Sequence, residues 1–184
     1  MIVDENIINI HNGSGFTVTK TSQICEFDDS KSKPDAATIT FENVGASYHN
    51  LDTEASCYFG DSSKCSYWNC WENVTWGDVL MIGIHGGYKA QYIIENKNVT
   101  SLNVVDDNQD LINYIDYIDN SITVTHTSDM SIYNSIKKYD LIIVQCYHWP
   151  SDYTSEIRSN LKTHYSSLLK EGGSVVVPII NKVL

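Results

Sequence analysis

The stretch Asp78-Val-Leu-Met-Ile-Gly-Ile-His-Gly-Gly87 decides the fold that the sequence predicts. Its first seven residues form an almost continuous apolar run, which is typical of a β-strand buried on both faces. The glycines that follow, Gly86 and Gly87, indicate a turn into a helix that we expect to reach Glu95. A buried strand that leads directly into a helix is the first half of a βαβ unit and predicts a parallel sheet.

The same alternation of strand and helix continues along the rest of the chain. We expect further strands at 101–105, 121–126, 140–146 and 174–180, and further helices at 108–118, 131–137 and 151–169. Gly172 and Gly173 indicate the turn before the last strand. This order predicts an α/β fold, a Rossmann-like parallel sheet of about five strands with right-handed crossovers and helices on both faces.

The sequence before residue 76 has a different character. It is rich in turns and short β-like runs, so we expect a small β-rich N-terminal segment at 1–75 and a Rossmann-like domain at 76–184. The expected elements are strands at 2–10, 16–21, 24–27 and 37–44, a turn at 11–15, a polar loop at 28–36 and an aromatic-rich helix at 65–74.

Composition and charge exclude several classes of partner. The chain has 184 residues, a net charge of −11 and a single arginine, Arg158, so it lacks the clustered basic side chains that bind nucleic acid phosphates. A small molecule or a protein is the expected partner. No stretch approaches the roughly 20 apolar residues of a membrane span, and the N-terminus does not resemble a signal peptide. We therefore expect a cytoplasmic protein that binds no membrane.

The five cysteines give no clear metal-binding pattern. Cys57, Cys65 and Cys70 cluster near His49, but their spacing does not match the common zinc motifs. We expect reduced thiols and no metal.

Polar residues follow the first three strands of the predicted sheet. In open α/β sheets, ligands bind beyond the carboxyl ends of the strands. The first strand ends in the glycine-rich turn at 83–87, which lets a ligand approach the backbone closely. The second strand ends in Asp106, 23 residues after Gly83, near the spacing at which an acid binds ribose hydroxyls. Asp129 follows the third strand. The alternative is that Asp106, Asp107 and Asp129 are solvent-facing helix caps.

Residues 78–178 resemble the class I S-adenosylmethionine-dependent methyltransferases, most closely their spermidine-synthase-like branch. The resemblance rests on the stretches at 78–87, 102–108, 139–145 and 168–177. It implies that S-adenosylmethionine is the cofactor. By this resemblance the turn residues Gly83, His85, Gly86 and Gly87 hold the amino-acid part of the ligand, Asp106 binds the ribose and Asp129 binds the adenine.

The sequence also departs from that family. His85 replaces the middle glycine of the first motif, and Met81 replaces its leading acid. Gln145 stands where aminopropyltransferases have a catalytic aspartate, and an amide cannot act as a base, which argues against ordinary spermidine synthesis.

An aromatic stretch follows the fourth strand, where many methyltransferases position their acceptor. It gives two candidate catalytic residues, His148 as a general base and Tyr147 as a stacking group. The alternative is an aromatic loop that packs on a neighbouring segment.

Two functions fit these patterns. The first is an S-adenosylmethionine-binding, methyltransferase-like protein that acts on a small molecule or a protein side chain. The second is a catalytically inactive protein of the same fold with a structural or interaction role, and the Asn-, Ile- and Tyr-rich composition suggests a phage or virus as its source. A nicotinamide cofactor fits poorly because two glycines of its fingerprint are missing. By resemblance, residues 1–75 cap the site and join subunits into a homo-oligomer.

Overall fold

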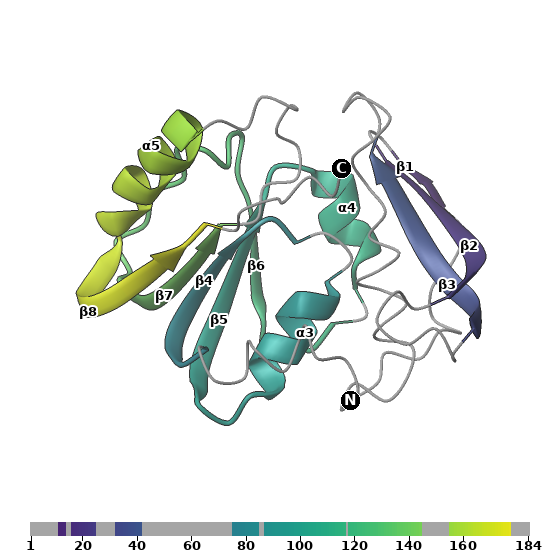
Figure 1. Cartoon of the computed structure of the whole chain (residues 1–184), viewed down its shortest axis with the longest axis horizontal. Coiled ribbons are helices and arrows are strands. Elements are labelled where there is room, and N and C mark those ends of the chain that lie inside the picture. Colours follow the sequence, from purple (N-terminus) through teal and green to yellow (C-terminus); the bar gives the residue numbers. More distant parts are fainter. Residues whose placement is uncertain are drawn as a thin grey trace.

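The computed structural model describes residues 11–13, 16–24, 32–41, 75–84, 87–116, 118–144 and 155–177. Within these ranges the chain forms two sheets, one of three strands and one of five (Figure 1).

The five-stranded sheet contains the candidate site. Its strands are β4 (Gly77–Ile82), β5 (Val99–Asp106), β6 (Thr123–His126), β7 (Tyr139–Val144) and β8 (Leu169–Val176). They lie in the order β6-β5-β4-β7-β8, and each neighbouring pair is parallel. The chain therefore begins in the centre, adds two strands on one side, and then crosses over to add two on the other. The predicted α/β fold with a five-stranded parallel sheet is confirmed.

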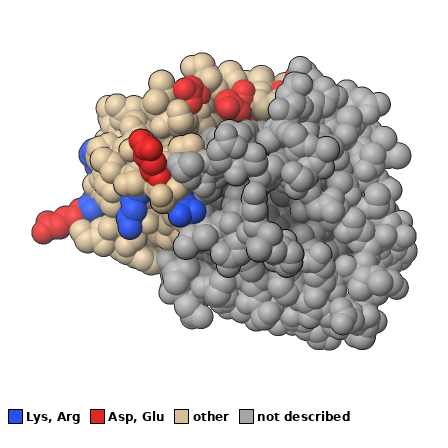
Figure 2. Space-filling model, turned by 45° about the horizontal axis from the view of Figure 1, so that its top comes forward, with Lys and Arg blue, Asp and Glu red and all other residues tan. Residues whose placement is uncertain are grey.

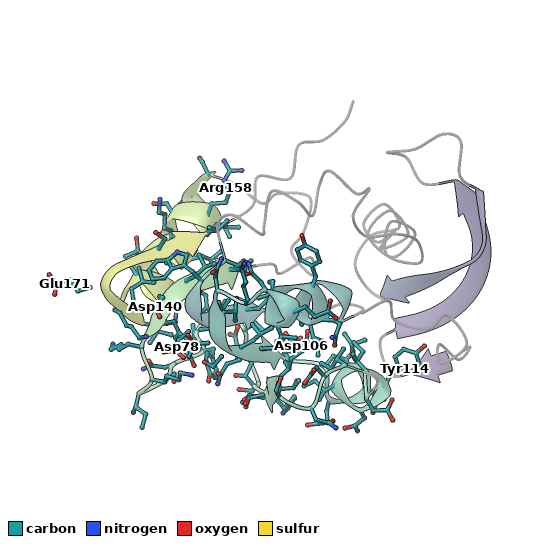
Figure 3. All side chains as sticks on the ribbon, turned by 90° about the horizontal axis from the view of Figure 1, so that it is seen from below. Asp78, Asp106, Tyr114, Asp140, Arg158 and Glu171 are labelled. Atoms are coloured by element: carbon teal, nitrogen blue, oxygen red, sulfur yellow. The ribbon has the colours of Figure 1, made fainter. Side chains whose placement is uncertain are left out.

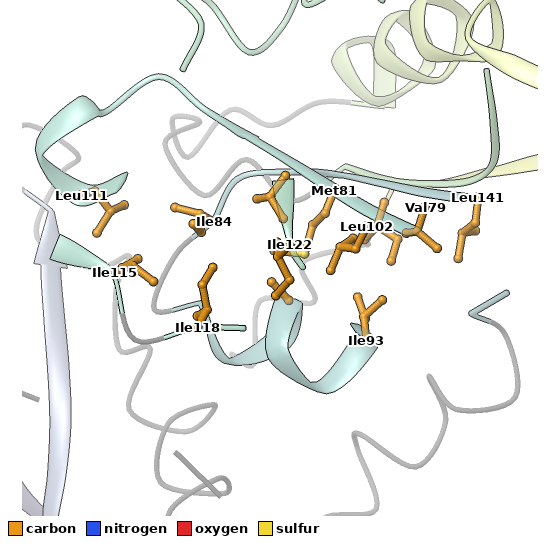
Figure 4. Packing of buried hydrophobic residues seen from close by; sticks show 13 residues of the cluster. Val79, Met81, Ile84, Ile93, Leu102, Leu111, Ile115, Ile118, Ile122 and Leu141 are labelled. Atoms are coloured by element: carbon orange, nitrogen blue, oxygen red, sulfur yellow. The ribbon is translucent and has the colours of Figure 1, made fainter. Parts of the chain in front are cut away.

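Helices pack on both faces of this sheet because β4 is apolar on both sides. Val79 and Met81 face the cluster that contains α3 (Tyr88–Glu95) and α4 (Gln109–Tyr114). Leu80 and Ile82 face the opposite cluster, with α5 (Ser155–Ser166). All four side chains are fully buried. The first cluster is shown in Figure 4, where Ile93 of α3 lies near Leu102 of the sheet and Leu111 of α4 lies near Ile84.

The helix predicted at 131–137 is wrong, because the chain between β6 and β7 forms turns and bends. Side chains there take up backbone N–H groups locally. Asp129 accepts a hydrogen bond from the N–H of Ser131, and Ser135 accepts one from the N–H of Lys137. Such local bonds compete with the i→i−4 bonds of a helix.

The bounds of α4 and β8 also differ from those predicted. α4 ends at Tyr114, four residues before the predicted end at Ile118. β8 begins at Leu169, but its pairing with β7 jumps from Leu169 to Ser174. The predicted turn at 172–173 therefore lies inside an irregular strand, and Gly172 has a left-handed φ of 79°.

The three-stranded sheet is antiparallel and lies in the N-terminal segment. It consists of β1 (His11–Gly13), β2 (Phe16–Ile24) and β3 (Ser32–Phe41). β3 begins inside the predicted polar loop and includes Pro34, which falls where the register between β2 and β3 shifts. A residue without an N–H group is tolerated at such an irregularity. The expected strand at 2–10 and the helix at 65–74 lie outside the described residues.

No helix in the described part of the chain is long and apolar enough to cross a membrane.

Candidate functional site

The candidate site lies at the carboxyl edge of the five-stranded sheet. The strand order reverses between β4 and β7, the central pair from which the chain extends in opposite directions. In open parallel sheets the carboxyl ends of the strands at such a reversal border the ligand crevice. Of the predicted binding residues, Asp106 is the last residue of β5, and Gly83 and Asp129 follow the ends of β4 and β6 on the same edge.

The turn after β4 is fixed to β5 by two successive N–H groups. The N–H of Gly83 donates to the carbonyl oxygen of Val105 at 2.7 Å, and the N–H of Ile84 donates to Oδ2 of Asp106 at 2.8 Å. Gly83 has a φ of 95°, a conformation that side chains disfavour. This bend lets the second N–H group reach the carboxylate.

Gly87 closes the turn and begins α3. Its N–H donates to the carbonyl oxygen of Ile84 at 2.9 Å, and its φ is 76°. A Cβ atom at this position would lie 2.6 Å from Cγ2 of Ile115 and 2.7 Å from Cγ2 of Ile118. Only glycine satisfies both the backbone conformation and the packing.

Asp106 is the buried centre of this edge. It is 1% exposed, and Oδ1 accepts the N–H of Asn108 at 2.9 Å while Oδ2 holds Ile84. Its carbonyl oxygen accepts the N–H of Thr127 at 2.9 Å, which links β5 to the end of β6. The alternative of a solvent-facing helix cap is wrong for Asp106, because Asn108 is the N-cap of α4 and accepts the N–H of Leu111.

Asp129 lies at the same edge but is exposed. Its Oδ1 accepts both the N–H of Ser131 at 2.8 Å and the hydroxyl of Ser131 at 2.6 Å. These bonds stabilise the charged form and lower the pKa of the Asp129 carboxyl. The carboxylate therefore orders the turn after β6 and caps no helix there.

Four predicted site residues lie outside the described residues: His85, Gly86, Tyr147 and His148. Gln145 and the cysteine cluster at 57–70 lie outside them as well. Within the described ranges, no group of three or more His, Cys, Asp or Glu side chains is arranged to hold a metal ion.

Two groups that form hydrogen bonds at the carboxyl edge were not predicted from the sequence. The backbone N–H of Ile84 has no signature in the sequence, because any residue except proline carries it. Asn108 does have one, since Asn three residues before a buried Leu111 is a typical N-cap.

A second polar cluster lies at the opposite, amino edge of the sheet. The Nζ atom of Lys170 lies 2.6 Å from Oδ2 of Asp78 and 2.7 Å from Oδ2 of Asp140, which also accepts the N–H of Asp78 at 2.8 Å. Lys137 contacts Oδ1 of Asp78 at 3.4 Å, and the hydroxyl of Ser101 donates to the same oxygen. Figure 3 shows Asp78 and Asp140 side by side and apart from Asp106.

The electrostatics of this cluster favour ionised carboxylates. Hydrogen bonds from Lys170 and Ser101 lower the pKa of Asp78 to about 2. The pKa of Asp140 is also lowered, mainly by Lys170, and the pKa of Lys170 is raised by the same two carboxylates. The cluster holds together the starts of β4 and β7 and the irregular start of β8.

Acidic and basic residues are distributed unevenly over the sheet. Residues 98–136 contain six aspartates and no lysine or arginine. They include the ends of β5 and β6, whereas Lys137 and Lys170 lie at the amino edge. On the face shown in Figure 2, several acidic side chains lie along the upper border of the described part.

Solved structures with the same fold include DhpI in complex with SAH, with 14% identity and a TM-score of 0.50 over 64% of this chain and 56% of that one. An S-adenosylmethionine-dependent methyltransferase from Clostridium acetobutylicum matches at 21% identity and a TM-score of 0.45 over 64% and 50% of the two chains. The N-methyltransferase NodS from Bradyrhizobium japonicum, in complex with SAH, matches at 19% and 0.44 over 55% and 51%. The chain thus spans only about half the length of these proteins.

The likeness to DhpI shows a shared fold. No protein-family model and no curated protein sequence matches the chain.

Proposed function

We propose that this protein binds S-adenosylmethionine at the carboxyl edge of the five-stranded sheet, as a methyltransferase-like protein that acts on a small molecule or a protein side chain. The observation that carries the proposal is the buried Asp106 carboxylate at the end of β5, which accepts the N–H of Ile84 just after β4, beside the strand reversal. Ligands of open parallel sheets bind at this place. The fold shared with DhpI, which was solved with SAH, supports the nucleoside as ligand.

The charge distribution supports a cationic ligand over a dinucleotide. S-Adenosylmethionine carries a sulfonium cation, whereas NAD and related cofactors carry a pyrophosphate. The six aspartates of residues 98–136 attract a sulfonium cation and repel a pyrophosphate. No lysine or arginine in that range offsets their negative charge.

Calorimetric titration of the full chain with S-adenosylmethionine and with SAH tests the binding. We expect a saturable signal, and ligand at 100 times Kd should stabilise the protein by about 2.7 kcal/mol in thermal unfolding. Asp106→Asn should weaken the binding, and Asp116→Asn serves as a matched control because Asp116 is an exposed aspartate distant in sequence from the turn. The absence of both heat and stabilisation at millimolar ligand would refute the proposal.

Transfer activity is a separate question. We propose His148 and Tyr147 as the residues that face the acceptor. A methyl-transfer assay with labelled S-adenosylmethionine, run separately on a small-molecule fraction and a protein fraction of a cell extract, identifies the class of acceptor. Binding with no transfer to either fraction would favour the inactive interaction protein. We also propose a homo-oligomer joined through residues 1–75, and light scattering of the full chain against a chain that begins at residue 76 tests that assembly.

A further inference from the structure

We propose that Tyr165 is a positioning residue: its hydroxyl holds the turn after β6, so that the Asp129 carboxylate can accept a hydrogen bond from the amino group of the adenine. This inference rests on the proposed function, with Asp129 as the residue that binds the adenine, and it names the side chain that keeps Asp129 in place. Tyr165 lies in α5, 35 residues after Met130, whose carbonyl oxygen accepts its hydroxyl.

The first argument is that the chain after Asp129 has no helix to fix its position. The segment between β6 and β7 forms turns and bends, so its carbonyl oxygens lack the N–H partners that a helix supplies four residues later. Within the described residues, the hydrogen bonds of the Asp129 side chain are local, because Oδ1 accepts the N–H and the hydroxyl of Ser131. These bonds shape the turn but do not attach it to the sheet. Its position therefore depends on contacts with other elements.

The second argument is that Asp129 lies between two residues that are anchored to different elements. The N–H of Thr127 donates to the carbonyl oxygen of Asp106 at 2.9 Å, which attaches the start of the turn to β5. Directly after Asp129, Met130 is 2% exposed, and its carbonyl oxygen accepts the hydroxyl of the fully buried Tyr165. The first anchor joins two backbones, whereas the second depends on one side chain. Loss of the hydroxyl therefore releases the turn on the side that leads away from β5.

The third argument is that the residue before Tyr165 holds the same segment at a second point. Nε2 of His164 lies 2.9 Å from the carbonyl oxygen of Tyr133, and its ring meets the Tyr165 ring edge to face, with centroids 4.9 Å apart. Two consecutive side chains of α5 therefore hold two carbonyl oxygens of the segment. A carbonyl oxygen only accepts hydrogen bonds, so Tyr165→Phe removes one of these contacts while it keeps the aromatic ring.

The consequence concerns how the protein distinguishes ligands with and without the amino group. A hydrogen bond to a charged acceptor corresponds to a preference of about 10- to 100-fold. We therefore expect the wild type to bind SAH at least about tenfold more tightly than its 6-deamino analogue, which lacks the amino group. If Tyr165→Phe lowers the population of the correctly placed turn to about one tenth, most of this preference is lost, and the affinity for the analogue stays the same.

Calorimetry on the full chain measures both affinities for the wild type, Tyr165→Phe and the control Thr163→Val. Thr163 lies in the same helix, but its hydroxyl donates at 2.9 Å to the carbonyl oxygen of Ser159 within α5, so its loss leaves the turn after β6 unchanged. We expect Tyr165→Phe to weaken SAH about tenfold and the analogue less than about twofold, whereas the control weakens neither. A purely structural role lowers the melting temperature and leaves the preference for SAH as it is. An unchanged preference would therefore overturn the proposal.

Asp129→Asn tests whether Tyr165 acts through Asp129. Asparagine keeps an oxygen that can accept the N–H of Ser131, but it loses the charge and the second acceptor oxygen. If Tyr165 acts through Asp129, Tyr165→Phe added to Asp129→Asn should reduce the preference for SAH no further. A further loss of similar size in the double variant would show that Tyr165 acts on the ligand by another route, and this result would overturn the proposal.

A readout without ligand separates this inference from the proposed function. In Tyr165→Phe we expect the NMR order parameters of the Met130 and Ser131 N–H groups to fall from roughly 0.85 to below about 0.6, because the turn is held at one end only. Unchanged order parameters would overturn the proposal. If the wild type binds neither S-adenosylmethionine nor SAH, the proposed function fails, and the order parameters still decide whether Tyr165 orders the turn. Should Tyr165→Phe not fold, His164→Ala, which removes the second contact of α5 with the segment, is measured in the same way and should reduce the preference for SAH.

Discussion

The two edges of the five-stranded sheet both hold aspartates at strand ends, but they do so with different hydrogen-bond donors. At the carboxyl edge Asp106 is 1% exposed and its carboxylate is satisfied by the backbone N–H groups of Ile84 and Asn108. At the amino edge Asp78 and Asp140 remain partly exposed and share Lys170. Backbone donors have fixed positions, whereas a lysine side chain adapts. The contacts at the carboxyl edge therefore fix the backbone in one geometry, whereas the contacts at the amino edge join neighbouring strands.

The largest expected effect comes from steric substitution at the carboxyl edge. Gly87→Ala places a Cβ atom within 2.7 Å of two isoleucine methyl groups at a φ of 76°. Left-handed strain and overpacking together should lower the free energy of unfolding by about 2–5 kcal/mol. Urea unfolding measures this loss.

Gly172→Ala is the matched control at the other edge. Gly172 has a similar φ of 79°, but a Cβ atom there would meet nothing within 4 Å. Only the backbone strain remains, so we expect a loss of about 1 kcal/mol. Equal losses at the two glycines would show that the packing around Gly87 is looser than the structure indicates.

The next expected effect is a difference in salt dependence between the carboxylate bound by backbone N–H groups and the carboxylate bound by lysine. Asp106→Ala leaves two N–H groups without their acceptor, which should cost about 2–4 kcal/mol of unfolding free energy. Because buried bonds are little screened, this cost should be the same in dilute buffer and in 1 M NaCl. The cost of Asp78→Ala should shrink in salt. Urea midpoints at both salt concentrations test the contrast, and a strongly salt-dependent cost for Asp106→Ala would refute it.

The five-stranded sheet could be predicted because the sequence patterns of its strands and helices are local. The run at 78–84 and the later alternation of strands and helices follow from periodicity alone, so the predicted elements lie close to β4 through β8. The helix at 131–137 failed because the bonds of Asp129 and Ser135 to nearby N–H groups compete with helical periodicity.

The sites were harder to predict because their contacts are distant in sequence. Asp78 meets Asp140 across 62 residues and Lys170 across 92 residues, and no local pattern signals such pairs. Asp106 was predicted at the correct strand end. Its burial was not, because two adjacent aspartates look alike in a sequence and only the fold turns one of them toward Ile84.

A smaller effect is expected at the start of α4, which follows directly from the carboxyl edge. Asn108→Ala removes the side-chain oxygen that accepts the N–H of Leu111 at 3.0 Å but keeps the backbone N–H that Asp106 holds. Loss of such a cap should lower the free energy of unfolding by about 1 kcal/mol. Asn120→Ala, at an exposed position, serves as the control and should change the urea midpoint little. An Asn108→Ala variant with an unchanged urea midpoint would mean that Asp106 alone orders the start of α4.

The smallest effect is a pH dependence that belongs to the amino edge. The pKa of Asp78 is about 2 in the folded protein, below its ordinary value of 3.8. A carboxyl with a depressed folded pKa stabilises the protein above its unfolded pKa, and this stabilisation is lost as the pH falls through the folded pKa. We therefore expect the wild type to lose stability between about pH 5 and pH 2, with about 1 kcal/mol of the loss due to Asp78 after allowance for solvent screening. Asp78→Asn should flatten the urea midpoint over this range, whereas Asp116→Asn should not. An Asp78→Asn profile that falls as steeply as the wild type would assign the acid sensitivity to other carboxylates, with the lysine cluster contributing only at neutral pH.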